Sequence, residues 1–171
     1  MTKFYLAAAL LILLLIGRPL NAACDQADGN GASSTAATTG KWQVTTPDKI
    51  DWQPTNLLPL GAQIAVLEGD PSIPGFFTIR LKMPDGYRIP AHWHSQAERI
   101  TVLSGTLHLG MGDGSNPGTA LPFGAGIYCS MPPKMVHFGW TKGETILQLT
   151  SIGSWTITYV KSADDPRNGS K

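Results

Sequence analysis

Short runs of β-branched and aromatic residues, separated by glycine or proline, are the feature that most constrains how this chain can fold. These runs are QIAVLE, FFTIRLKM, RITVLS, TLHLGM, GIYCSM, MVHFGW, TILQLTSI and SWTITYV. Such residues favour strands, and the 13 prolines and 19 glycines among 171 residues would interrupt most helices. The sequence therefore predicts an all-β domain, a sandwich or a barrel, with a jelly roll as one way to protect the strand edges.

Turn signals fall between several of these runs. Four groups combine residues that favour tight turns, and we expect a hairpin at each: Pro84-Asp85-Gly86, Ser104-Gly105, Asp113-Gly114 and Lys142-Gly143. A slip of one residue exchanges the two faces of a strand. The sequence alone therefore leaves open which side chains of these strands would face a substrate.

The N-terminal segment has the pattern of a secretory signal peptide. Lys3 precedes an apolar run from Phe4 to Ile16, and the small residues Ala22 and Ala23 follow. The run is shorter than the roughly 20 apolar residues that a membrane-spanning helix needs. We therefore expect residues 1–23 to be removed, leaving a secreted or periplasmic protein with no transmembrane span in the mature chain. Cys24 raises an alternative, a lipoprotein anchored through this residue.

The rest of the chain divides by composition into a linker, one folded domain and a tail. Residues 24–40 lack large apolar side chains, so we expect a disordered linker. Residues 41–161 hold all the strand-like runs and suit a single domain, and residues 162–171 are expected to form a flexible tail. Removing Lys3 and Arg18 from the 13 basic residues leaves 11 against 12 acidic ones. That balance gives no reason to expect a nucleic-acid partner.

Three histidines and one glutamate form a candidate metal site. His92 and His94 lie two apart in a strand-like run, so both project from one face. Glu98 begins the next run after a connection short enough to return its carboxylate to the same place. His137 lies in a later run that barrel closure could bring beside them. Three imidazoles and a carboxylate suit Fe, Mn, Ni, Co, Cu or Zn, so we expect one divalent transition metal per chain with positions open for other ligands.

Other candidate residues have simpler interpretations. His108 alternates with apolar neighbours and is expected to point away from the interior. Arg80 and Lys82 alternate in the same way, which favours a solvated face over a clamp for a substrate carboxylate. Cys129 is expected to be a small buried residue rather than a reactive thiol. Three aromatic residues, Tyr128, Trp140 and Trp155, are expected in the core or in a dimer interface.

The spacing of the candidate ligands resembles the first sequence motif of the cupin superfamily. The fixed positions of that motif are matched, at the family's spacing, by Gly86, His92, His94, Glu98 and Gly105. The chain is thus similar to small, single-domain, type-2-like cupins from secreted bacterial proteins. This resemblance implies a double-stranded β-helix (the cupin jelly-roll barrel), a metal held by the two histidines and the glutamate, and a homodimer.

The second cupin motif is matched in part. Gly126, Pro132 and His137 have the family's spacing, which implies that His137 completes the ligand set. Lys134 stands where the family usually has glycine, and Thr141 stands where it often has asparagine. We expect Lys134 to alter the turn before the ligand strand and Thr141 to remove a customary polar group, with the ligands themselves unaffected.

The resemblance implies action on a small molecule, and two functions stay open. One is an enzyme that binds its substrate on the metal, as a dioxygenase-type oxidoreductase or as an isomerase or lyase, with Glu98 as a possible base. The other is a non-catalytic module that binds or senses a small ligand in a metal-dependent way. Fold and ligand set alone do not choose between them.

Overall fold

The computed structural model describes residues 42–169. The predicted signal peptide, residues 1–23, and the predicted linker, residues 24–40 with Cys24, lie outside the described residues. Within the described part, no helix is long and apolar enough to cross a membrane.

The described residues form nine strands and four short 3-10 turns. The strands are β1 (Gln53–Pro54), β2 (Gln63–Glu68), β3 (Gly75–Met83), β4 (Arg88–His94), β5 (Glu98–Met111), β6 (Leu121–Gly124), β7 (Tyr128–Met131), β8 (His137–Gly153) and β9 (Ile157–Tyr159). The turns are η1 (Pro47–Lys49), η2 (Pro117–Thr119), η3 (Ser162–Asp164) and η4 (Pro166–Asn168). The prediction of an all-β domain is confirmed.

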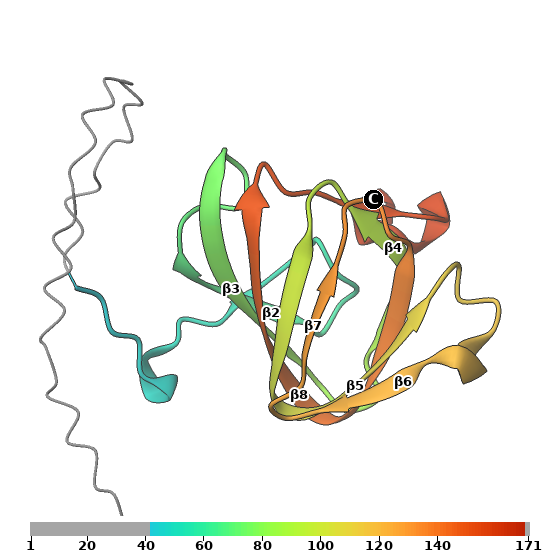
Figure 1. The fold of residues 1–171 in the computed structure, drawn as a ribbon, viewed down its shortest axis with the longest axis horizontal. Helices are drawn as coiled ribbons and strands as arrows, with labels where there is room; N and C mark the ends of the chain where they lie inside the picture. The colour runs from blue at the N-terminus through green and yellow to red at the C-terminus, as the bar shows by residue number, and fades with distance from the viewer. Residues whose placement is uncertain (1–41, 170–171) are drawn as a thin grey trace, which may run out of the picture. The chain divides into compact units, whose positions relative to one another are not determined.

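Strand β8 organises the sheet because it pairs with three others. The strands lie in the order β1-β2-β3-β8-β4-β9, and β5 pairs with β6, β7 and β8. All of these pairings are antiparallel. Figure 1 shows the sheet curling on itself, so that β2 and β3 stand on one side and β4 and β6 on the other. Strands distant in the sequence therefore line one interior.

The core lies inside this curl and follows the alternation of side chains along the strands. In β3, Phe77, Ile79, Leu81 and Met83 are all buried. Each such side chain contributes about 2 kcal/mol of hydrophobic stabilisation when removed from water. They pack against buried aliphatic residues of β5 and β8 in a single cluster.

The charged residues between them lie on the outer face of β3. The Arg80 guanidinium donates from Nε to Oε1 of Gln148 at 3.2 Å. The Lys82 ammonium lies over the Trp52 ring, 4.7 Å from its centroid. Both cations thus have partners outside the barrel, which matches the solvated-face interpretation and leaves no clamp for an interior substrate.

Two of the four expected hairpins are bends in continuous strands. Strand β5 runs on through Ser104-Gly105 and β8 through Lys142-Gly143, where the pairing of the two strands shifts register. Gly105 has φ +71°, and a Cβ there would lie 2.4 Å from the backbone oxygen of Glu144. The turn residues therefore mark the corner at which the sheet folds over. The other two signals lie in connections, after β3 and after β5.

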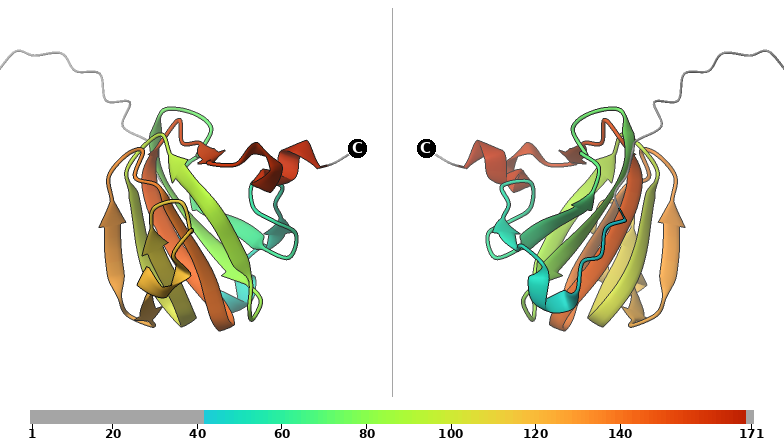
Figure 2. Two further views of the ribbon diagram at one scale, coloured as in Figure 1. Left: turned by 90° about the vertical axis from the view of Figure 1, so that its right-hand side faces the viewer. Right: turned by 90° about the vertical axis from the view of Figure 1, so that its left-hand side faces the viewer.

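Residues 55–60, here called the mouth segment, cross one end of the barrel and are tied there by two tyrosines. The Tyr159 hydroxyl donates to the backbone oxygen of Leu57 at 2.8 Å, and the Tyr87 hydroxyl donates to that of Pro59. Leu58 is buried against the core cluster. Figure 2 shows this N-terminal stretch on the same side of the barrel as the C-terminal turns.

Residues 162–169 belong to the segment for which we expected a flexible tail, and they contain η3 and η4. Arg167 explains their order. Its guanidinium pairs with the Asp165 carboxylate at 2.6 Å and also donates to the backbone oxygen of Ile157 at 3.0 Å. A tail of small polar residues is therefore attached to the last strand by one cation, which composition alone does not reveal.

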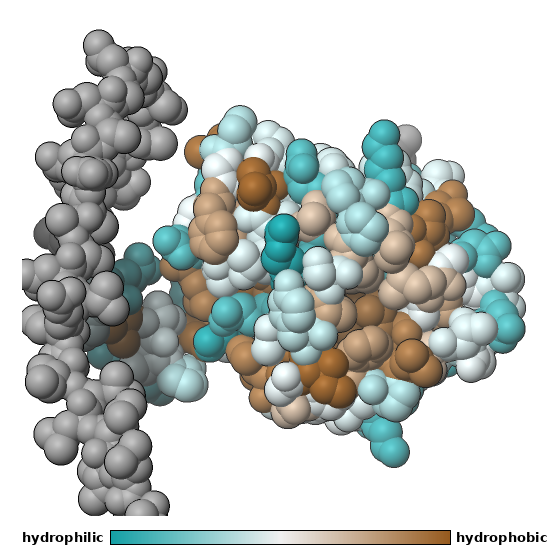
Figure 3. Space-filling view, in the orientation of Figure 1, coloured by the Kyte–Doolittle hydropathy of each residue, from teal (hydrophilic) through white to brown (hydrophobic). Residues whose placement is uncertain are grey.

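Several large apolar side chains are exposed on the outer face, among them Phe76, Ile152 and Tyr128. Figure 3 shows brown side chains gathered mainly in the lower half of one face, between white and teal ones. Patches of this kind are often interaction sites. The homodimer stays a prediction.

Candidate metal centre

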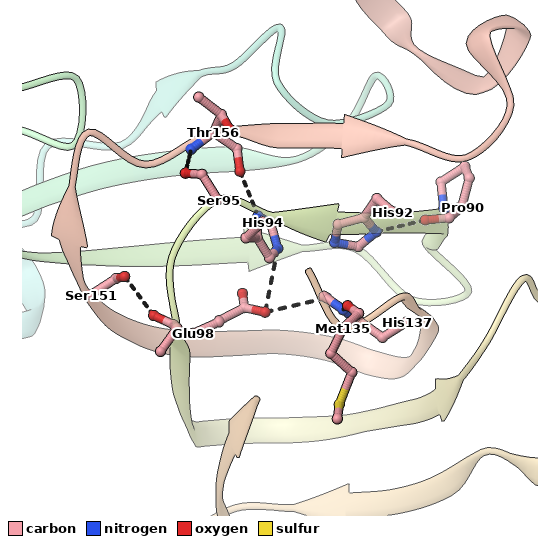
Figure 4. Close-up of polar contacts among 10 residues, drawn as sticks. Pro90, His92, His94, Ser95, Glu98, Met135, His137, Ser151 and Thr156 are labelled. Atoms are coloured by element: carbon pink, nitrogen blue, oxygen red, sulfur yellow. Dashed lines mark hydrogen bonds and ion pairs between the residues drawn. The ribbon is translucent and has the colours of Figure 1, made fainter. Parts of the chain in front are cut away.

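The four predicted ligands come together inside the barrel. His92 and His94 are both on β4, Glu98 is the first residue of β5, and His137 is the first residue of β8. Figure 4 shows their side chains pointing toward one another. The exposed fractions are only 3–5%, so all four are buried polar side chains. Alternation along β4 places both histidines inside, as predicted, and the pairing of His92 with His137 brings β8 beside them.

Backbone carbonyls orient all three imidazoles. Nδ1 of His92 lies 2.7 Å from the oxygen of Pro90, Nδ1 of His94 lies 3.1 Å from that of Thr156, and Nδ1 of His137 lies 2.9 Å from that of Met135. A carbonyl only accepts, so these contacts assign a proton to Nδ1, and in the neutral form of each imidazole Nε2 then carries the lone pair. This is the arrangement found when histidine binds a metal through Nε2.

The atoms that face the centre are close together but do not satisfy one another. Oε2 of Glu98 lies 3.3 Å from Nε2 of His94 and 3.2 Å from Nε2 of His137. These are ion-pair distances, and no hydrogen bond of regular geometry joins Oε2 of Glu98 or Nε2 of His94 to a partner among the described residues. Buried polar atoms are rarely left unpaired. Converging lone pairs of this kind are what a cation would satisfy.

Distances within the histidine triad fit a single ion. One ring nitrogen from each of His92, His94 and His137 lies within 4.8 Å of the others. Two nitrogens bound to one ion at about 2.1 Å each lie at most about 4.2 Å apart, so only small movements are needed. The buried triad could therefore bind a metal, and the Glu98 carboxylate lies 3.2–3.3 Å from two of its nitrogens. The set of nitrogen and oxygen donors suits first-row transition metals without choosing among them.

Charge in the cluster also favours a cation. Burial, together with the neighbouring His137 and His94, lowers the pKa of His92 to about 3, so this imidazole is neutral at pH 7. Burial by itself would raise the pKa of Glu98, but His94 and His137 outweigh it and lower that pKa. Burial would likewise lower the pKa of His137, yet the Glu98 carboxylate beside it raises it. The lowered pKa of Glu98 thus reflects positive charge carried by the neighbouring imidazoles, and a bound cation would supply that charge in their place.

The cluster opens on an apolar cavity of about 50 Å³. Its lining includes aliphatic residues of β2, β3, β5 and β8, together with Leu57 and Leu58 of the mouth segment and Trp155. Apart from the four candidate ligands, Thr55 is the only polar side chain among the described lining residues other than the indole of Trp155. No lysine or arginine is among them. The cavity therefore has room for a group of a few heavy atoms and offers no positive charge except a bound metal.

Two other predicted residues lie away from this centre. The His108 ring stacks on Trp140 with centroids 5.1 Å apart, and neither lines the cavity, whereas the adjacent Leu107 does. Cys129 is half-buried against the core. Its burial, and to a smaller extent the negative charge of Glu98, raise the pKa of its thiol. A thiol with a raised pKa is a poor nucleophile at pH 7.

Trp155 is a site residue that the sequence did not identify. Its indole stacks on the His94 ring at 4.1 Å with an interplanar angle of 15°, and it lines the cavity. Sequence reasoning placed it in the core or an interface. Trp155 precedes Thr156, whose backbone oxygen contacts Nδ1 of His94. That contact joins residues 62 apart in the chain, so no local pattern in the sequence indicates it.

The two departures from the second cupin motif leave the local geometry intact. Lys134 has φ +64°, the left-handed conformation that glycine adopts easily, and its amide donates to the backbone oxygen of His94 at 2.8 Å. Thr141 is buried, accepts from the amide of Tyr87 at 2.9 Å and donates to the oxygen of Pro84 at 2.6 Å. Lys134 thus adopts a conformation that glycine also adopts, and the Thr141 hydroxyl holds two backbone groups of the preceding turn.

An all-β barrel with three histidines and a glutamate inside it defines a cupin. The family model of the ChrR cupin-like domain matches residues 41–156 of this chain. The chain therefore belongs to that family. No curated protein matches the sequence.

Solved structures give the same fold. The polyketide cyclase RemF from Streptomyces resistomycificus superimposes with a TM-score of 0.61 at 16% identity, covering 74% of this chain and 90% of that one. An RmlC-like cupin from Shewanella frigidimarina gives 0.53 at 14%, covering 67% and 93%. An acetylacetone dioxygenase from Acinetobacter johnsonii gives 0.55 at 15%, covering 74% and 82%. These similarities confirm the double-stranded β-helix predicted above.

Proposed function

We propose that this protein is a metal-dependent enzyme that acts on a small, largely apolar molecule bearing oxygen, in a dioxygenase-type reaction. One observation carries the proposal. Three imidazoles and the Glu98 carboxylate converge at the wall of an apolar cavity. His92, His94, Glu98 and His137 would hold the metal, which would supply a Lewis acid and a centre for oxygen activation.

The cavity supports a particular kind of substrate. Its aliphatic lining suits a short hydrocarbon body, and the absence of lysine and arginine among the described lining residues disfavours phosphates and multiply charged acids. The fold neighbour named as an acetylacetone dioxygenase is named for a compact diketone of this kind. Glu98 lines the same cavity, so its carboxylate is placed to accept a proton from such a substrate.

Metal content is the first test. The mature protein, purified from its own compartment, is expected to carry about one transition metal per chain by elemental analysis. His94→Ala should lose it, whereas His108→Ala, the matched change on the outer face, should keep it. Wild-type protein without stoichiometric metal, before and after incubation with Fe(II), Mn(II), Ni(II) or Zn(II), would refute the proposal.

Turnover is the second test. Each metal form is mixed with short-chain carbonyl compounds, and oxygen uptake is followed with an electrode. Uptake in one metal form, absent in His94→Ala, is expected. Product without oxygen uptake would assign an isomerase or lyase instead.

A non-catalytic function is the second candidate, and the family match favours it because that family takes its name from ChrR rather than from an enzyme. In that case a small ligand would bind in a metal-dependent way and be recovered unchanged. Consumption of the ligand would exclude this candidate.

We also propose that the protein is exported, through the signal-like residues 1–23. The intact mass of the mature chain tests this. A chain that begins near Cys24 supports export, and an added mass of lipid on Cys24 would assign the anchored form. An unprocessed chain would refute it.

A further inference from the structure

The indole of Trp155 has a buried hydrogen-bond donor that the protein does not use. Nε1 of Trp155 is inaccessible to solvent and has no partner among the described residues. Four buried side-chain atoms of the described residues have no hydrogen-bond partner: Nε1 of Trp155, Nε2 of His94, Oε2 of Glu98 and Nδ1 of His108. The first three belong to residues that line the cavity. A donor left unpaired costs about 1–3 kcal/mol. The concentration of such atoms at one place indicates a site prepared for a ligand.

A metal would satisfy two of those three atoms but not the third. Nε2 of His94 and Oε2 of Glu98 carry lone pairs that a cation can accept, whereas an indole N–H can only donate. Its partner must therefore be an acceptor atom. None of the described residues accepts from it, and an acceptor oxygen on a molecule bound in the cavity would pair with it.

The position of the indole is fixed firmly enough to select a ligand. Its ring stacks on His94 at 4.1 Å and meets Phe77 edge-on at 5.9 Å. The backbone amide of Trp155 donates to the oxygen of Pro71 at 2.8 Å, and that of Thr156 donates to Oγ of Ser95 at 3.0 Å. A donor held in this way loses little conformational freedom when it binds an oxygen.

We propose that Trp155 is a specificity-determining residue whose indole N–H binds an oxygen of the substrate while the metal binds the substrate as well. This inference rests on the proposed function and narrows its substrate class to compact, uncharged or enolised carbonyl compounds, in which an acceptor oxygen lies close to the atom bound at the metal. A hydrocarbon, or a molecule whose oxygen is remote from the metal, would leave the donor unpaired.

Binding to the Zn(II)-loaded protein tests the inference without turnover, because zinc has no redox chemistry. Acetylacetone is titrated calorimetrically into the wild type, Trp155→Phe and Trp140→Phe. Phenylalanine keeps an aromatic ring against His94 but removes the N–H together with one ring of the indole, so the NMR readout described next isolates the role of the N–H. Trp140 lies outside the cavity, which makes it the matched control. Trp155→Phe is expected to raise the Kd about tenfold, the equivalent of about 1.4 kcal/mol, and Trp140→Phe should leave it unchanged.

The indole N–H signal of Trp155 in wild-type Zn(II) protein gives a second readout, one that a merely structural role would not move. It should shift downfield in the NMR spectrum when acetylacetone binds, as an N–H does on gaining an acceptor. This measurement remains valid if Trp155→Phe fails to fold. Elemental analysis of each variant shows whether the metal is retained.

The outcomes separate the inference from the proposed function. Binding by the wild type with an unshifted indole signal overturns the role of Trp155, whatever the variant does, and leaves the proposed function standing. Absence of acetylacetone binding by metal-loaded wild type overturns the inferred substrate class. Absence of metal overturns both the inference and the proposed function.

Discussion

Lys134→Gly is expected to stabilise the protein by about 0.5–1 kcal/mol. Lys134 has φ +64°, a left-handed conformation that costs a residue with a side chain about 1–2 kcal/mol. Glycine avoids this cost but lowers the free energy of unfolding by about 0.4–1 kcal/mol, because it increases the conformational entropy of the unfolded chain. The side chain of Lys134 is exposed, so its removal sacrifices little packing. The balance favours glycine.

Urea unfolding of the mature protein, with chelator present so that metal binding does not contribute, measures this difference. The slope m should stay the same while the midpoint rises. Lys134→Ala is the matched control, because it also removes the side chain yet keeps the backbone strain. Its stability should lie within about 0.5 kcal/mol of the wild type. If glycine proved no more stable than alanine at this position, the argument from φ would be wrong.

Metal affinity should not change in Lys134→Gly, because the link from this turn to the site is a backbone amide that donates to the oxygen of His94. Glycine retains that amide. A loss of affinity measured by competition with a chelator would mean that the lysine side chain takes part in the site.

The remaining predictions concern buried polar contacts. Thr141→Val should lower the free energy of unfolding by about 2 kcal/mol, since its buried hydroxyl makes two hydrogen bonds; Thr150→Val, which loses one long contact of 3.4 Å, should cost less in the same urea experiment. Excess Zn(II) should stabilise the wild type by about 4 kcal/mol at 1,000 times its Kd, and an equal effect on His137→Ala would contradict the ligand assignment. Burial raises the pKa of Tyr159 to about 12. Its folded pKa then exceeds the unfolded value of about 10, so the stability it contributes is present below pH 10 and is lost as the pH rises toward 12. Tyr159→Phe should be less sensitive to this rise, and parallel curves of stability against pH would refute the assignment.

The sequence predicted the parts of the site that depend on local rules. His92 and His94 face inward because strand side chains alternate, and Glu98 follows them closely enough for a short connection to bring it back. His137 lies in a run far beyond Glu98, so the sequence could place it at the site only on the assumption of barrel closure or of the cupin motif. Its approach depends on the pairing of β8 with β4, which no local pattern determines.

The features that the sequence did not predict all arise from long-range pairing. Gly105 and Gly143 have the composition of hairpin turns, yet they lie at the bend of two long strands, because β5 and β8 continue to pair on both sides of it. Trp155 reaches His94 only because β9 pairs with β4. Arg167 contacts the backbone oxygen of Ile157, which lies on that same strand β9. Each of these depends on where two distant segments meet, which composition and spacing do not encode.

The backbone carbonyls that hold Nδ1 of the three histidines affect how this site can evolve. Side-chain partners could be lost by a single substitution, whereas the oxygens of Pro90, Met135 and Thr156 are present whatever residues occupy those positions. The tautomer of each imidazole is therefore a property of the strand geometry rather than of its neighbours' identities. Substitutions in the aliphatic wall can alter which molecule fits without disturbing the donor atoms. A lineage could in this way exchange substrates while the inner coordination chemistry stays the same.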